Sequence, residues 1–155
     1  MRMRVYIAAP YSMKDTIAKE AAELEAAGFI CTSSWVKEPH KPTTQMHELT
    51  HEEHQTYALQ DVRDVAYADA LVFHTDPTKT IVRGGRHVEF GMMVGISMAR
   101  NHIFHDRCRP IYVVGTEQEN IFHHLPQVTH FQTWEQVLAQ LKLDRQAAYD
   151  DLPFC

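Results

Sequence analysis

The sequence predicts an α/β protein, a three-layer sandwich with a mainly parallel sheet of about five strands. Short apolar runs alternate with helical stretches about five times along the 155 residues. Capping signals stand before most of the helical stretches, and glycine or proline ends several of the segments. Apolar residues make up 45% of the chain, which is enough to bury one sizeable core.

The first half of the chain supplies three predicted strands and two predicted helices. Residues 4–9 form an apolar run that Pro10 ends. A capping-box pattern at residues 12–15 opens a helix, which Gly28 ends as a C-cap glycine. The next elements are a strand at residues 29–36, a long loop at 37–49, a helix from a second capping box at Thr50 to about Tyr67, and a strand at 70–73.

The second half continues the alternation. A loop over residues 75–85 leads into an apolar helix whose first turn is expected to hold Glu89. Two further strands follow at residues 111–114 and 128–131, and Thr133 caps a last helix. We expect one domain over residues 1–143 and a loose polar tail over residues 144–155.

A parallel sheet of this kind places its ligands beyond the carboxyl ends of its strands. The alternation is typical of flavodoxin-like and Rossmann-like folds, in which the crossovers are right-handed. The predicted carboxyl ends lie at Ala8–Tyr11, Ser34–Lys37, His74–Asp76 and Gly115–Glu119. The loop that precedes Glu89 starts from one of these ends.

Composition and missing motifs exclude several classes of protein. The net charge is −5 without a basic block, so nucleic acid is not an expected partner. The turn after the first strand lacks the glycines of a dinucleotide site, and no P-loop or nucleophile elbow occurs. The N-terminal apolar run is too short for a signal peptide or a membrane span, so we expect a cytoplasmic protein with no membrane partner. The three cysteines have unrelated spacings and are expected to be reduced.

Histidines are frequent, with 11 in the chain, and residues 47–51 match the letters of the zinc-protease pattern H-E-x-x-H. That chemistry needs both histidines on one helix face. Thr50, as the predicted N-cap, would separate His47 from His51. We therefore expect no metal and no cofactor, although a metal-dependent hydrolase remains an alternative.

Three motifs together point to a known family. Tyr6 lies in the first strand, in VYIAAPYS, and Asp61 lies eight residues before Asp69, in QDVRDVAYADALVF. Glu89 lies in GGRHVEFG, ahead of the apolar helix. Over roughly residues 4–120 this pattern resembles the nucleoside 2-deoxyribosyltransferase family, which includes the 2′-deoxynucleoside 5′-monophosphate N-glycosidases.

The resemblance implies roles for particular residues. Glu89 matches the family's nucleophile, Tyr6 the tyrosine that holds it, and Asp61 the aspartate that contacts the sugar hydroxyls. Arg83 stands where the transferases carry an aspartate used at the nucleobase. The resemblance also implies a small-molecule nucleoside or nucleotide substrate. It further implies a homodimer or larger assembly with shared sites, in which Asn120 is the candidate residue from the partner.

The residue types suit cleavage of an N-glycosidic bond. The transition state is oxocarbenium-like, and a carboxylate below C1′ can stabilise it or bond to it. A helix N-terminus would favour the ionised form of Glu89, and the Tyr6 hydroxyl can donate to it. The opposing interpretation is that Glu89 only caps its helix. The protein would then be a catalytically silent nucleotide-binding module of the same fold.

A phosphate site is expected beside this centre. The amides around Ser12 and Lys14 would open a helix beyond the first strand, which is a natural seat for an anion. Arg83 and Arg86 can add charge, and Arg83 can hold a phosphate in a bidentate fork. Gly85 would let the loop that carries Arg83 close over a ligand.

Trp35 is a further candidate, because a tryptophan at the end of the second strand can stack on a base. A place in the core is an equally good interpretation of the same residue. The sequence leaves open the base, the sugar, the choice between nucleoside and monophosphate, and the choice between hydrolysis and transfer.

Overall fold

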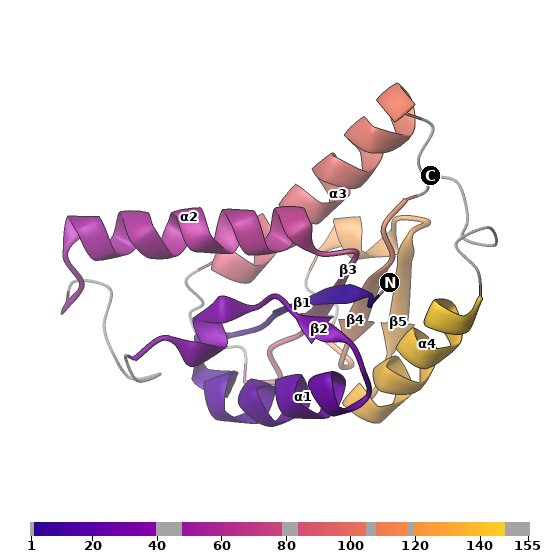
Figure 1. Cartoon of the computed structure of the whole chain (residues 1–155), viewed down its shortest axis with the longest axis horizontal. Helices are drawn as coiled ribbons and strands as arrows, with labels where there is room; N and C mark the ends of the chain where they lie inside the picture. Colours follow the sequence, from indigo (N-terminus) through magenta and orange to yellow (C-terminus); the bar gives the residue numbers. More distant parts are fainter. Residues whose placement is uncertain (1, 40–47, 79–83, 105–107, 118–119, 148–155) are drawn as a thin grey trace.

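The computed structural model describes residues 2–39, 48–78, 84–104, 108–117 and 120–147. Its centre is a parallel sheet of five strands in the order β2-β1-β3-β4-β5, which confirms the predicted fold class (Figure 1). The strands are β1 (Arg4–Ala8), β2 (Ile30–Cys31), β3 (Ala70–His74), β4 (Ile111–Val114) and β5 (Val128–Phe131). The strand order reverses between β1 and β3, so this is where a doubly wound sheet opens a crevice for ligands.

Helices cover both faces of the sheet. Helices α1 and α4 lie on one side of it in Figure 1, and α2 and α3 lie on the other. The helices are α1 (Lys14–Ala26), α2 (His51–Tyr67), α3 (Gly85–Phe104) and α4 (Trp134–Gln146). The described residues also include the short 3₁₀ helices η1 (Tyr11–Met13), η2 (Ser34–Lys37) and η4 (Ile121–His124).

The three central strands form the core. Every residue of β3 and β4 is buried, as is every residue of β1 after Arg4. Strands covered on both faces need apolar side chains throughout, which explains why the sequence shows continuous apolar runs here rather than alternation. Tyr6 is fully buried in β1 and pairs in register with Leu71 of β3.

The second strand is shorter than predicted. The strand expected at residues 29–36 ends at Cys31, and the chain then turns into η2. Hydrogen bonds from backbone amides to side chains account for this early end of β2. Ser33 Oγ accepts the Ile7 amide of β1 at 2.6 Å, and Asp64 accepts the Ser34 amide at 2.9 Å. These backbone donors are satisfied without a longer β ladder.

Two of the three predicted capping boxes are confirmed. Thr50 and Thr133 both form complete boxes, with Glu53 and Gln136 respectively. The box predicted at residues 12–15 is wrong, because Tyr11–Met13 is a 3₁₀ turn and Met13 leads into α1 without a side-chain cap. Gly28 follows the end of α1 with φ 88°, as its role as terminator requires.

The helix that carries Glu89 begins earlier than predicted. Gly84, with φ 79°, starts the turn, and its carbonyl accepts the amides of His87 and Val88. Helix α3 then begins at Gly85, so its first turn contains no acidic residue and Glu89 lies in the second turn. The expectation of a first-turn Glu89 is wrong, and so is the interpretation of Glu89 as a helix cap.

The remaining differences concern the cysteines and the C-terminal end. Cys31 is free, but Cys108 is disulfide-bonded, so the expectation of three reduced cysteines is wrong at Cys108. Helix α4 continues to Gln146, into the segment expected to be a tail. In the part of the chain that the structure describes, no helix has the length and apolar character needed to cross a membrane.

Gly115 directly follows β4 and lies against Thr75, which directly follows β3. It has φ 113°, and a Cβ added there would lie 2.0 Å from Thr75 Oγ1. Gly115→Ala is expected to lower the free energy of unfolding by about 2–3 kcal/mol, through both backbone strain and overpacking. Urea unfolding measures this. The control is Gly95→Ala on α3, where nothing lies within 4 Å of the added Cβ. That change is expected to raise stability by up to about 1 kcal/mol.

Candidate active site

The site is built on a contact between β1 and α3 at the point where the strand order reverses. The Tyr6 hydroxyl donates a hydrogen bond to Glu89 Oε1 at 2.8 Å, across 83 positions of sequence. The sequence motifs that contain these two residues are therefore brought together as expected. Asp61 of α2 is the third member, because its charge acts on both Tyr6 and Glu89.

Tyr6 keeps its proton in this setting. Burial, and next the negative charges of Glu89 and Asp61, raise the pKa of Tyr6 well above its ordinary value. A tyrosine that stays neutral is a permanent hydrogen-bond donor. Its hydroxyl can hold the Glu89 carboxyl in one orientation at any pH at which the protein is folded.

Glu89 holds its own proton tightly. Burial, followed by the charge of Asp61, raises the pKa of Glu89 to about 8, although the Tyr6 hydroxyl acts in the opposite direction. The sequence argument expected a helix N-terminus to favour the anion. That influence falls off beyond the first turn, and Glu89 lies in the second. Burial and neighbouring carboxylates therefore dominate.

Asp61 presents an acceptor that the protein does not use. Its Oδ1 atom is buried and accepts no hydrogen bond from the described residues. Burial, and next the charge of Asp64, raise the pKa of Asp61 to about 6. A buried acceptor without a donor costs free energy unless a ligand supplies one. Sugar hydroxyls are suitable donors.

Asp64 was missed by the sequence argument, although it lies one turn after Asp61 on the same helix. Its carboxylate accepts the Ser34 amide at 2.9 Å and also the Ser34 hydroxyl. It thereby fixes the start of η2 against α2. Two aspartates three positions apart share a helix face, which was the available signal.

The Ser12–Lys14 segment is arranged differently from the predicted anion seat. Ser12 is exposed within η1, whereas Lys14 is buried. Lys14 Nζ donates to the Tyr11 hydroxyl at 3.2 Å and to the backbone carbonyl of Glu38. Burial lowers the pKa of Lys14. Its ammonium therefore joins η1 to the end of η2.

Trp35 of η2 occupies a core position. It is 5% exposed, and its indole N–H donates to the Ile7 carbonyl at 3.0 Å. Tyr11 packs against it with ring centroids 5.8 Å apart. Of the two interpretations of Trp35, the structure favours the core, and Tyr11 is the more accessible ring of the pair.

Glu38 is the second acid that the sequence argument missed. It caps η2, half-buried, immediately before the undescribed segment 40–47. Burial, and next the charge of Asp61, raise the pKa of Glu38 to about 7, against the charge of Lys14 and a hydrogen bond with Tyr11. Its charge in turn raises the pKa of Glu89.

The remaining predicted site residues are Arg83, Gly85, Arg86 and Asn120. Arg83 is one of the undescribed residues. Arg86 is buried with its guanidinium carbon 5.4 Å from the centre of the Phe73 ring. Gly85 begins α3, and Asn120 caps η4 by accepting the Phe122 amide at 3.0 Å. The contribution of Asn120 to a partner's site stays a prediction.

The H-E-x-x-H pattern of residues 47–51 does not lie within one helix. Thr50 is the N-cap of α2, so His51 is its first residue, and His47 lies outside the described residues. Within the described ranges, no group of three or more histidine, cysteine, aspartate or glutamate side chains could hold a metal ion.

Solved structures share this architecture, although the sequence matches no family model and no curated protein. A 2-deoxyribosyltransferase from Bacillus psychrosaccharolyticus has a TM-score of 0.61 at 13% identity, over 87% of this chain and 90% of that one. The chain shares the fold of a 2-deoxyribosyltransferase. The Clostridium botulinum CMP N-glycosidase BcmB has a TM-score of 0.52 at 16% identity, over 90% and 98% of the two chains. A conserved protein from Enterococcus faecalis has a TM-score of 0.61 at 12% identity, over 93% and 99%.

The resemblance based on the Tyr6, Asp61 and Glu89 motifs is thus confirmed at the level of the fold. Identities this low establish the backbone arrangement and not the reaction.

The raised pKa of Glu89 has a consequence for stability. Ionised Glu89 is disfavoured in the folded state, so its cost is absent below the ordinary pKa of 4.5 and grows until about pH 8. Glu89→Gln is therefore expected to raise the free energy of unfolding by about 1–2 kcal/mol at pH 8 and to change it little at pH 4.5. Urea unfolding at both values checks this. Glu25→Gln, on the exposed face of α1, is the control. A gain from Glu89→Gln that is equal at both pH values would contradict the argument.

Proposed function

We propose that this protein cleaves the N-glycosidic bond of a nucleoside or nucleoside 5′-monophosphate through Glu89. The glycosyl group would pass to water or to another base. The observation that carries the proposal is the Tyr6–Glu89 hydrogen bond at the strand-order reversal, with the unused acceptor of Asp61 beside it. The resemblance in fold to a 2-deoxyribosyltransferase and a CMP N-glycosidase supports it.

Glu89, Asp61 and Tyr6 have separate roles in a double displacement. Glu89 attacks C1′ as the bond to the base breaks, which gives a covalent glycosyl intermediate. Asp61 accepts hydrogen bonds from the sugar hydroxyls and fixes the ring above Glu89. Tyr6 prevents the Glu89 carboxylate from rotating away. An acceptor then attacks C1′ from the face that the base has left, so configuration is retained.

Glu89 must be ionised when it attacks, although its pKa in the empty site is about 8. Substrate binding can change this balance. Positive charge develops at C1′ next to the carboxylate, and that charge favours the ionised form. A sugar hydroxyl bound to Asp61 also weakens the repulsion between Asp61 and Glu89. Glu89 is therefore best suited to react within a complex with its substrate.

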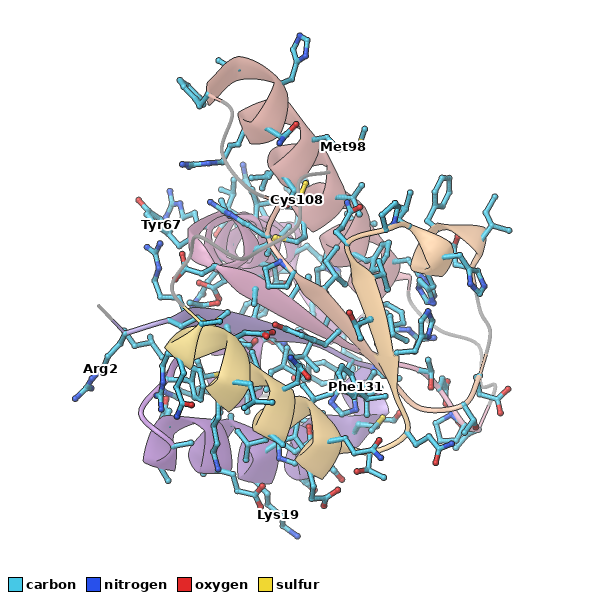
Figure 2. The ribbon with its side chains drawn as sticks, turned by 90° about the vertical axis from the view of Figure 1, so that its right-hand side faces the viewer. Arg2, Lys19, Tyr67, Met98, Cys108 and Phe131 are labelled. Atoms are coloured by element: carbon cyan, nitrogen blue, oxygen red, sulfur yellow. The ribbon has the colours of Figure 1, made fainter. Side chains whose placement is uncertain are left out.

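The test is release of free base from a panel of nucleosides, deoxynucleosides and their 5′-monophosphates. Glu89→Gln is expected to reduce release to background. Tyr6→Phe is expected to lower kcat/KM by about ten- to a hundredfold, since a hydrogen bond to a charged group is lost. Tyr67→Phe is the matched control, because this side chain is 65% exposed on α2 (Figure 2). A wild-type protein that binds nucleotides but releases no base would indicate the silent binding module instead.

We further propose that the protein forms a homodimer or larger assembly through α2 and α3. Met93 of α3 is fully buried, and Met92 and Ile96 on the same helix are partly buried. Among the described residues of α2 and α3, the exposed and wholly apolar side chains are instead Leu59, Val62, Val88, Met98, Ile103 and Phe104. Several of them lie on the part of α3 that extends past the sheet (Figures 1 and 2).

Light scattering at micromolar protein is expected to give at least twice the mass of 17.9 kDa. Ile103→Lys is expected to shift the population toward monomer, because it places a charge in an apolar interface. Leu143→Lys, which changes a similarly exposed residue on α4, is expected to leave the mass unchanged. A monomeric wild type would overturn the assembly.

A further inference from the structure

The segment of residues 33–35 joins the strand that carries Tyr6 to the helix that carries Asp61. It contains the N-cap and the first two residues of η2, where the sequence predicted a continued strand. Helix α2 packs against η2, β1 and α3, so this segment lies at a junction of the elements that build the site. The double displacement assigns no task to it.

On the strand side, the segment is bonded to Ile7, the residue that directly follows Tyr6. Ser33 Oγ accepts the Ile7 amide at 2.6 Å and donates to the Ile7 carbonyl at 3.2 Å. The indole N–H of Trp35 donates to the same carbonyl at 3.0 Å. Ser33 and Trp35 are both buried, so water does not compete for these bonds. The segment is therefore fixed relative to the strand of Tyr6.

On the helix side, the segment is bonded to Asp64. The Ser34 amide and the Ser34 hydroxyl both donate to one oxygen, Asp64 Oδ2, and the amide does so at 2.9 Å. Hydrogen bonds to a carboxylate are stronger than those between neutral groups. Asp64 lies three positions after Asp61 on α2, so the two side chains share a helix face. A shift or rotation of α2 that moved Asp61 would strain the bonds at Ser34.

Asp61 needs such support because its binding atom must remain open. Asp61 Oδ1 is buried and accepts no hydrogen bond from the described residues. A protein donor at this atom would hold it in place, but it would also occupy the position that a sugar hydroxyl needs. The place of Asp61 is therefore set mainly by the helix that carries it, and Asp64 anchors that helix one turn away.

We propose that Ser34 and Asp64 are positioning residues that hold Asp61 where it accepts the sugar hydroxyls. This inference rests on the proposed function and names the support of its sugar-binding group. The contacts run from β1 through the 33–35 segment to Asp64 of α2. They set the spacing between strand and helix, and with it the place of Asp61 relative to the Tyr6–Glu89 pair. In this role Ser34 and Asp64 act through Asp61 and do not touch the substrate.

A double-mutant cycle separates positioning of Asp61 from a general loss of stability. Asp64→Ala is expected to lower kcat/KM for base release from the best substrate of the panel by about ten- to a hundredfold, the scale of a misplacement of about 1 Å. In the Asp61→Ala protein, which has no carboxylate left to position, Asp64→Ala is expected to cost less than about threefold. Circular dichroism melting verifies that each variant is folded at the assay temperature.

Conservative variants give a second measurement. Both Ser34 donors use a single oxygen of Asp64, and asparagine retains one carbonyl oxygen as an acceptor. Asp64→Asn is therefore expected to restore most of the kcat/KM that Asp64→Ala loses. Ser34→Ala removes the hydroxyl and keeps the amide, so it is expected to lose less than Asp64→Ala. Gln60→Ala, an exposed position of α2 beside Asp61, is the control and keeps the wild-type rate.

The outcomes separate the two proposals. A folded Asp64→Ala variant with the wild-type kcat/KM overturns the positioning role and leaves Glu89 as nucleophile. A loss from Asp64→Ala that is as large in the Asp61→Ala protein as in the wild type overturns it as well, and so does an Asp64→Asn variant as poor as Asp64→Ala. A wild type that releases no base from any member of the panel overturns the proposed function, and the positioning role with it.

Discussion

The hydrogen bond from Tyr6 to Glu89 is the contact on which the rest of the site depends. It joins β1, at the centre of the sheet, to α3. The polar atom is the hydroxyl oxygen of Tyr6, at the end of a fully buried side chain. That atom needs a partner, because a buried hydroxyl without one costs free energy. Glu89 satisfies it and is itself held by it. The strand thus sets the position of the acid, and the acid stabilises the polar end of the strand residue.

The same arrangement crowds negative charge. Glu38, Asp61 and Glu89 all have a raised pKa, and burial is the largest cause in each case. The buried carboxyl groups lower the stability of the fold, and the burial of the apolar central strands offsets this cost. A ligand that presents hydroxyl donors and develops positive charge would relieve the crowding. Under the proposed function, that ligand is a reacting nucleoside, and relief of the crowding would be complementarity to its transition state.

Sequence reasoning located the strands of the core well, because β1, β3 and β4 lie in apolar runs bounded by turn signals. It also brought Tyr6 and Glu89 together, since both motifs belong near the carboxyl edge of one sheet. It failed where side chains replace backbone pairing. Ser33 and Asp64 accept hydrogen bonds from the amides of Ile7 and Ser34, so β2 stops early and the chain turns into η2. No local propensity encodes a bond between residues thirty positions apart.

The early end of β2 also limits how this protein can meet other chains. Strand β2 forms one border of the sheet and is only two residues long. An incoming strand would find too few backbone donors and acceptors there to extend the ladder. Growth by strand addition, the route to fibrous aggregates, is thus blocked on that side by brevity alone.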